Sequence, residues 1–390
     1  MIMKVKRIIS LFIAVLFLPA LCYARNQLAV RAVNKLSIAR SNQTIELTAR
    51  QLASFDEKDL AKIHVKDSSG SELLCQAVDT DYDDYHKPDM LIFQTDFAPG
   101  ESKTFLLYSG KKHEYSKEDF KAYGRFVRER FDDFAWENDR IAHRSYGKAL
   151  ITWKGEPLTS SAIDIWSKRV SRLVVNDWYL LDNYHVDAGE GADDYSAGAS
   201  RGCGGNGIWV NNQLYVPQNF SDSRVLANGP IRVLFDLIYE PFVVGQTNVS
   251  EVLRVSLDAG SQLDHFQSLY KWQSGSAAAG VAVGLKKVKG ERGELNAGRG
   301  WLAIWEPMEK NLGMQGVAAI VNPQEFDRQA EDQQNNLIVL KPGAENPVNY
   351  WAGFAWDRAG KITSAEAWKK YVDEFAQGLL SPLEISVLPV

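Results

Sequence analysis

Residues 232–239, RVLFDLIY, decide the fold class, because they form a short run that is rich in β-branched and aromatic side chains. Runs of similar length recur along the second half of the chain, at Val252–Leu257, Val281–Val288, Gly300–Trp305, Gly316–Val321 and Leu337–Leu340. Many short strands with few intervening helices are typical of a large antiparallel sandwich. We therefore expect an all-β protein.

A second group of shorter strands precedes this region. They are expected at Thr44–Thr48, Lys62–Lys66, Leu73–Val78, Met90–Gln94 and Thr104–Tyr108. The polar segment 111–122 has no apolar period and is interpreted as a linker. The predicted organisation is a small N-terminal β-sandwich at residues 25–110, the linker, and a large antiparallel β-sandwich at residues 123–390 that carries the site.

One helix is expected near the end of the large domain. Thr363 and Glu366 have the spacing of a capping box, and Gly378 is suited to end the helix. Its apolar stripe would comprise Trp368, Val372 and Phe375. A last strand is expected at Leu383–Val387.

The chain begins with the features of a signal peptide. A basic start at Lys4–Arg7 precedes the apolar run Ile8–Leu21, which is too short to span a bilayer comfortably. Cleavage after Ala24 (residues 1–24 removed) would export the protein to the periplasm or the medium. A lipid anchor on Cys22 is the alternative, but Leu21 stands where a small residue is expected.

Composition narrows the possible partners and cofactors. The formal net charge is −5 and there is no basic tract, so nucleic acid is not an expected partner. No later segment suits membrane insertion, and no phosphate loop, dinucleotide fingerprint or zinc-type cysteine spacing is present, so no cofactor or metal is assigned. Cys75 and Cys203 are either one disulfide or two buried free thiols.

The stretch Trp178–Trp209 is expected to hold the site, because it combines a histidine, carboxylates and aromatic rings with seven glycines. His185 and Asp187 would share a face if a strand persists through them, as a general base with its orienting acid or as two metal ligands with Glu190 as a third. The alternative is a buried histidine bonded to a backbone carbonyl, with solvated carboxylates.

Cationic and aromatic residues could complete such a site. On a strand at Ile141–Tyr146, Arg144 and Tyr146 would share one face with Arg140. That face is either a ligand surface or a set of arginines paired with nearby acidic residues. Arg201, flanked by glycine, could bind a substrate carboxylate, and Trp136 could stack on a sugar, although most tryptophans are core residues.

Four blocks together carry a resemblance that spans nearly the whole mature chain. They are Trp136–Arg140, Arg144–Gly147, Tyr184–Gly191 and Arg201–Gly205. The chain resembles an exported bacterial family known as domain-of-unknown-function family 4861. The resemblance implies polysaccharide breakdown, often beside enzymes for uronic-acid glycans, and a large sandwich of galactose-mutarotase-like type.

The leading hypothesis is an enzyme that acts on a uronic-acid oligosaccharide or polysaccharide by β-elimination, as a lyase or dehydratase. Arg144 or Arg201 would neutralise the carboxylate, His185 would be the base, and Tyr146 or Tyr195 would be the acid.

Three other functions stay open. A glycoside hydrolase would use two of Asp187, Glu190 and Asp194 as its acid/base pair. A non-catalytic sugar-binding protein would keep the aromatic and arginine contacts without turnover. A sugar mutarotase would need a histidine and a carboxylate but no arginine clamp.

Overall fold

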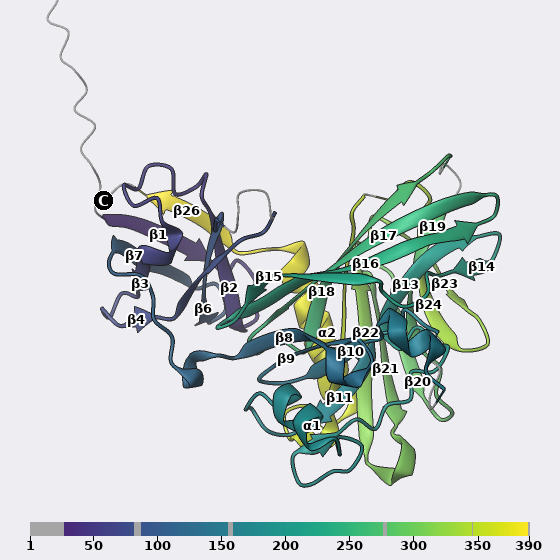
Figure 1. Cartoon of the computed structure of the whole chain (residues 1–390). Helices are drawn as coiled ribbons and strands as arrows, with labels where there is room; N and C mark the ends of the chain where they lie inside the picture. The colour runs from purple at the N-terminus through teal and green to yellow at the C-terminus, as the bar shows by residue number, and fades with distance from the viewer. Residues whose placement is uncertain (1–26, 82–86, 155–158, 276–278, 345, 389–390) are drawn as a thin grey trace, which may run out of the picture.

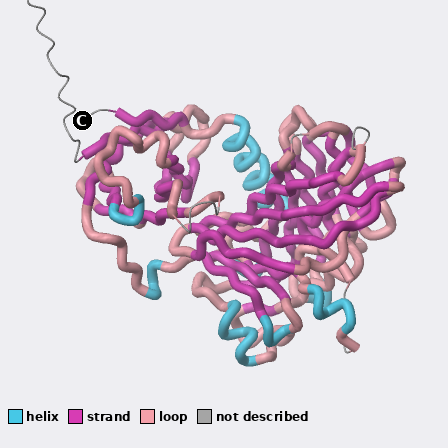
Figure 2. Tube along the Cα trace, turned by 45° about the horizontal axis from the view of Figure 1, so that its top comes forward, coloured by secondary structure: helices cyan, strands magenta, loops and turns pink. Residues whose placement is uncertain are grey.

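The computed structural model describes residues 27–81, 87–154, 159–275, 279–344 and 346–388. The expected signal peptide lies outside the described residues. Strands make up most of the regular secondary structure, as Figure 2 shows, and the paired strands within the sheets run antiparallel. The prediction of an all-β protein with one C-terminal helix is confirmed. Among the described residues, no helix is long and apolar enough to cross a membrane.

The N-terminal sandwich consists of two sheets, ordered β26-β1-β7-β3-β4 and β2-β6-β5. Its strands are β1 (Gln27–Val33), β2 (Arg40–Thr48), β3 (Ile63–Lys66), β4 (Glu72–Leu73), β5 (Cys75–Val78), β6 (Met90–Phe97), β7 (Ser102–Ser109) and β26 (Glu384–Leu388). The last strand was predicted within the large domain, but it pairs with β1, so the end of the chain completes the N-terminal sheet (Figure 1).

The large domain has three sheets. The eight-stranded sheet, ordered β15-β16-β17-β18-β25-β22-β21-β20, comprises β15 (Asp222–Asn228), β16 (Arg232–Val244), β17 (Thr247–Asp258), β18 (Leu263–Trp272), β20 (Arg292–Asn296), β21 (Trp301–Pro307), β22 (Met314–Val321) and β25 (Val348–Trp356). A five-stranded sheet, β14-β13-β19-β24-β23, comprises β13 (Cys203–Val210), β14 (Gln213–Tyr215), β19 (Gly280–Lys286), β23 (Phe326–Glu331) and β24 (Asn335–Leu340). The third sheet, β12-β11-β10-β9-β8, comprises β8 (Ala122–Val127), β9 (Asp133–Asn138), β10 (Ala142–Ser145), β11 (Asp164–Lys168) and β12 (Gly191–Ala192).

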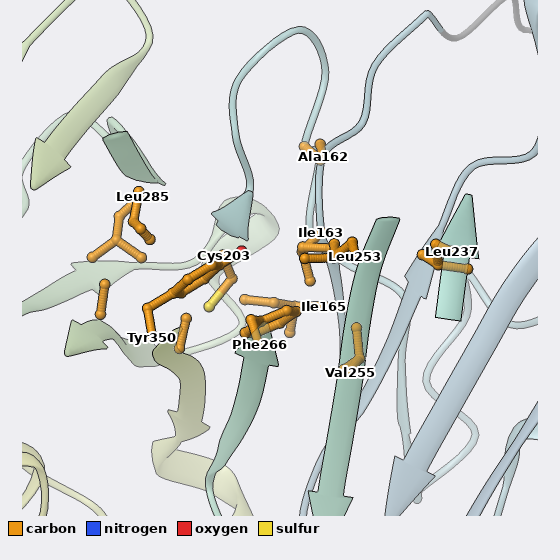
Figure 3. Packing of buried hydrophobic residues seen from close by; sticks show 14 of the residues in the cluster. Ala162, Ile163, Ile165, Cys203, Leu237, Leu253, Val255, Phe266, Leu285 and Tyr350 are labelled. Carbon is orange, nitrogen blue, oxygen red and sulfur yellow. The ribbon is translucent and has the colours of Figure 1, made fainter. Parts of the chain in front are cut away.

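The main core lies between the eight-stranded sheet and the other two. Side chains from β11, β13, β18 and β25 meet there, at Ile165, Cys203, Phe266 and Tyr350 (Figure 3). Cys203 is a free thiol in this core and Cys75 is a free thiol in the N-terminal core, so the alternative of two buried thiols holds.

Helix α2 (Ala365–Leu380) covers the opposite face of the eight-stranded sheet. Successive residues of β22 point to opposite faces of the sheet. Val317 packs in the main core, whereas Ala318 packs in the cluster that contains Trp368 of α2. The N-cap of α2 is Ser364, whose hydroxyl accepts from the Ala367 amide at 3.2 Å, and not the predicted Thr363. The helix also continues past Gly378, where it was expected to end.

The two sandwiches are joined by specific contacts. Arg232 of β16 bonds to Glu46 of β2 (2.7 Å) and to Asp258 of β17 (2.5 Å). The Gln76 side-chain carbonyl accepts from the Ile231 and Arg232 amides at 2.8 and 2.7 Å. The bonds of Arg232 to Glu46 and of Gln76 to the Ile231 and Arg232 amides hold the N-terminal sandwich against the large one.

Candidate functional site

The predicted site stretch begins with a short helix and not with the expected strand. Helix α1 (Val175–Leu181) is held at its N-terminus by Glu137 of β9, whose carboxylate accepts from the amides of Val174 and Val175 at 2.7 Å. Lys168 of β11 neutralises that carboxylate at 2.7 Å, with both side chains fully buried. Because residues 183–190 then form no strand, His185 and Asp187 do not share a strand face.

A buried cluster of three carboxylates surrounds Arg144 of β10. Its guanidinium reaches Asp193 at 2.8 Å, Asp164 at 2.9 Å and Asp133 at 3.5 Å. The same Asp164 oxygen accepts from the Tyr146 hydroxyl at 2.8 Å. The arginines of this face therefore pair with acidic residues, which is the second of the two alternatives that the sequence allowed. Arg140 pairs with the neighbouring Asp139 at 3.6 Å, whereas Arg144 pairs with these three more distant aspartates.

Burial dominates the electrostatics of this Arg144 cluster. It raises the pKa of Asp133 to about 7, although the Arg144 and Arg130 guanidinium groups oppose the shift. It also raises the pKa of Asp193 well above its usual value, against the effect of Arg144. Arg144 is thus bound to internal acids, and Tyr146 is only 3 % exposed. Neither of them is presented to a substrate in this conformation.

His185 lies at the edge of the Arg144 cluster. Its Nδ1 is 3.2 Å from the backbone carbonyl of Asp193 and 3.5 Å from the Asp193 carboxylate, while 55 % of its side chain is exposed. The structure therefore brings together three of the predicted site residues, His185, Arg144 and Tyr146. Asp193 and Asp164 link them into a chain that runs from His185 to Tyr146. Its accessible end is His185.

Asp187 and Glu190 instead bond to surface arginines. Asp187 pairs with Arg169 and also accepts from the amides of Gly189 and Gly191 at 2.8 and 3.0 Å, which shapes the loop. Glu190 accepts from Arg172 at 2.8 Å, and this bond lowers the pKa of Glu190. Their observed bonds are those of loop-stabilising residues. Within the described chain, no group of three His, Cys, Asp or Glu side chains is arranged to hold a metal.

Trp136 and Arg201 occupy the interior, which does not fit the binding roles expected from the sequence. Trp136 is fully buried, and its indole nitrogen donates to Asp264 at 2.7 Å. Arg201 is 1 % exposed and donates to the Ser161 hydroxyl at 2.9 Å and to the Asn206 carbonyl at 3.3 Å. Side chains so enclosed cannot contact a sugar unless the domain opens.

An open pocket of about 370 Å³ lies beside the loop that follows Asp193. It is lined by Asp194, Tyr195, Ser196, Lys286, Lys287, Val288, Lys289, Pro307, Met308, Glu309 and Gln315. We call it the lysine pocket, because three lysines face two carboxylates. The Lys286 ammonium lies 5.2 Å from the centre of the Tyr195 ring, and its donation to the Ser196 carbonyl (2.5 Å) ties the end of β19 to the loop.

Protonated acids lie in and behind the wall of the lysine pocket. Burial, together with the nearby Glu306, raises the pKa of Tyr195 well above its ordinary value, so its hydroxyl keeps its proton. Burial also raises the pKa of Glu306 to about 8. Glu306 bonds at 2.6 Å to the amide of Gln315, which lines the pocket. The pocket therefore combines cations for a bound anion with two groups that are neutral acids at pH 7.

Sequence reasoning missed Glu306, Gln315 and the three lysines. Two signals were present in the sequence. Lys286, Lys287 and Lys289 fall within four positions at the end of a predicted strand, and Glu306 follows the apolar run WLAIW directly. A carboxyl group in an apolar strand has few ways to stay solvated, and its pKa rises when it is buried.

Comparison with known proteins establishes the family. The model of the family described as "Domain of unknown function (DUF4861)" matches residues 33–385. The chain belongs to this family. A relative from Formosa agariphila, described as "Uncharacterized protein P7", is 31% identical over 368 residues, which cover 91% of this chain and 92% of that protein.

Solved structures of two Enterococcus faecalis proteins share the fold. One is an alpha-mannosidase, with a TM-score of 0.52 over 94% of this chain and 46% of that one. The other is a glycosyl hydrolase family 38 protein, with a TM-score of 0.54 over 94% and 48%. Both are 10% identical to this chain, which spans about half of their length. The likeness concerns architecture and assigns no site residue.

Proposed function

We propose that this protein is an exported carbohydrate-active enzyme that cleaves uronic-acid-containing oligosaccharides by β-elimination, in the lysine pocket. The main support for this proposal is that Lys286 and a buried, protonated Tyr195 line the same open pocket. The similarity of the fold to an alpha-mannosidase and a family 38 glycosyl hydrolase supports a carbohydrate substrate.

Charge favours an acidic sugar. The lysine pocket has three ammonium groups and two carboxylates along its wall, and Lys310 lies 3.1 Å from one of those carboxylates, on Asp194. Cations beside a uronate carboxylate stabilise the negative charge that develops when the C5 proton leaves. We therefore assign carboxylate neutralisation to Lys286 and its neighbours, in place of Arg144 or Arg201.

The reaction needs one base and one acid. A base removes the proton from C5, the C4–O4 bond breaks, a C4=C5 double bond forms, and the departing O4 takes a proton from an acid. Tyr195 is the proposed acid because it lines the pocket and its buried hydroxyl, which has no hydrogen-bond partner among the described residues, is protonated at neutral pH. His185 is the proposed base because its ring is exposed, beside Asp193, on the loop that also supplies Tyr195. Asp194 is the alternative base within the pocket.

Hydrolysis is the second candidate, and one observation favours it. Asp194 and Glu309 both line the pocket and come from different elements, as an acid/base pair on either side of a glycosidic bond would. This pair differs from the one expected from the sequence, since Asp187 and Glu190 pair with surface arginines.

Product analysis separates the two reactions. The protein is incubated with tetragalacturonate and related uronic-acid oligosaccharides, and the products are weighed by mass spectrometry. Elimination gives products whose masses sum to that of the substrate, with one unsaturated product, whereas hydrolysis adds one water. Lys286→Ala is expected to raise KM at least tenfold, while the exposed Lys271→Ala, outside the pocket, serves as the control. Product masses that sum to the substrate plus one water, with no unsaturated product, would refute elimination.

A further inference from the structure

A second pocket, of about 300 Å³, lies on the five-stranded sheet. It is lined by Trp209, Asn211, Asn212, Gly280, Asp327, Arg328, Val339, Leu340 and Pro342. We call it the Trp209 pocket. Trp209 packs with Ala282 and Val339, on the sheet face opposite the one that supplies Val281 and Ile338 to the main core.

A glycine faces the indole across the strand pair. Trp209 of β13 stands directly opposite Gly280 of β19. Because Gly280 has no side chain, no side chain stands beside the indole at this pair. A Cβ at Gly280 would lie 2.5 Å from the Leu340 carbonyl oxygen, so the close approach of β24 keeps this position small. The pocket is thus built into the sheet and does not depend on a loop conformation alone.

Polar groups gather at its rim from a turn and from a strand that are distant in sequence. Asn211 and Asn212 form the tight turn between β13 and β14, both with left-handed φ (52° and 61°). Asp327 and Arg328 come from β23; they pair with each other, and Arg328 also donates to the Asn212 side chain at 3.3 Å. Amides, a carboxylate and a guanidinium therefore stand side by side over an aromatic wall.

The Trp209 pocket is distinct from the lysine pocket. Gly280 begins β19 and Lys286 ends it, so the strand separates the two pockets by about 20 Å at roughly 3.3 Å per residue. Their charges also differ, because the Trp209 pocket has one cation and one anion that neutralise each other, whereas the lysine pocket has an excess of lysines.

We infer that the Trp209 pocket is a non-catalytic binding site for a neutral sugar residue. A sugar ring offers an apolar face for an aromatic wall and hydroxyl groups that both donate and accept. Asn211 and Asn212 supply both donors and acceptors, and the Asp327–Arg328 pair adds one of each without net charge. An acidic ligand would find no unpaired cation among the residues that line this pocket.

Such a site would act together with the lysine pocket on a long glycan. Two sites on one domain raise the effective concentration of a glycan that reaches both, so a polymer binds more tightly than a short oligosaccharide. Binding to a neutral sugar does not depend on the reaction in the lysine pocket, so the failure of one proposal would leave the other standing.

Isothermal titration calorimetry with the full mature chain tests this site. The probes are cellotetraose, xylotetraose, mannotetraose and tetragalacturonate. Trp209 is 7 % exposed, so the test variant changes exposed rim residues instead, as the double substitution Asp327→Ala and Arg328→Ala. Gln329→Ala, an exposed neighbour on β23 that does not line the pocket, is the matched control.

The expected result is that at least one neutral tetrasaccharide binds, and that the double variant weakens its Kd at least tenfold. Gln329→Ala and Lys286→Ala should leave that Kd unchanged within twofold. The inference is overturned if no neutral tetrasaccharide binds, if the double variant binds it as the wild type does, or if Lys286→Ala removes its binding. Loss of tetragalacturonate binding in the double variant would also contradict a neutral-sugar site.

Discussion

Replacing Arg144 with methionine tests whether the buried acids depend on one guanidinium. The substitution keeps much of the side-chain volume but removes the guanidinium that reaches Asp133, Asp164 and Asp193 together, at 2.8 to 3.5 Å. Breaking a buried ion pair costs about 3–5 kcal/mol, because the remaining charge stays buried without a partner. We expect a loss of about 4 kcal/mol at pH 8, which lowers Tm by about 10 °C in a domain of this size.

The loss should shrink at lower pH. Without the guanidinium, which opposes the effect of burial, the folded-state pKa values of Asp133 and Asp193 rise further above that of an unfolded aspartate, about 3.9. The folded variant then takes up protons as the pH falls, and protonation removes the unpaired charge. Urea unfolding at pH 8 and pH 5.5 measures both effects.

Arg172 provides the matched control for Arg144. It also pairs with two carboxylates, Asp177 and Glu190, but it is 44 % exposed, so Arg172→Met should cost at most about 1 kcal/mol. If Arg144→Met loses less than about 1 kcal/mol at pH 8, or loses the same amount at both pH values, the proposed dependence of the buried acids on Arg144 is wrong.

Three further predictions concern stability. Burial raises the pKa of Glu306 from 4.5 to about 8, so the stability that this group contributes is full below pH 4.5 and is lost as the pH rises through 8. Glu306→Gln should therefore reduce the decline in urea stability between pH 6 and pH 9. An unchanged decline would contradict this. Ser364→Ala removes the N-cap bond of α2 and should lower the free energy of unfolding by about 1 kcal/mol, measured by thermal unfolding. An unchanged Tm would show that the cap is dispensable. Gly202→Ala should destabilise the protein far more than Gly198→Ala. Both glycines have left-handed φ (60° and 56°), but a Cβ would lie 2.0 Å from the Ile163 carbonyl oxygen at Gly202 and in open space at Gly198. Equal urea midpoints of the two variants would contradict this.

The sequence allowed the strands and α2 to be predicted because their signals are local. The short apolar runs of β16 and β22 are rich in β-branched or aromatic residues, and the apolar stripe that contains Trp368 and Val372 follows helix periodicity. The end of α2 was less predictable, because Gly378 stays within the helix where Arg40 of the N-terminal sandwich bonds to its carbonyl. That contact joins residues far apart in the chain and leaves no local signal.

The site could be predicted only in part for the same reason. The chemistry of His185 and Tyr195 is visible in one loop, so both were named as candidates. The partners of Arg144 were not visible, because Asp133 and Asp164 belong to neighbouring strands and Asp193 to the loop. The lysine pocket is assembled from three segments that are distant in sequence, and only the fold brings them together.

The most direct test of the proposed function is the absorbance of the unsaturated uronyl group during incubation with tetragalacturonate and related uronic-acid oligosaccharides, with wild type, Tyr195→Phe and His185→Ala in parallel. β-Elimination in the lysine pocket predicts a rise with the wild type, a loss of at least a hundredfold in kcat for both variants, and unchanged folding by circular dichroism. New reducing ends without a rise in absorbance, or full activity in Tyr195→Phe, would contradict it.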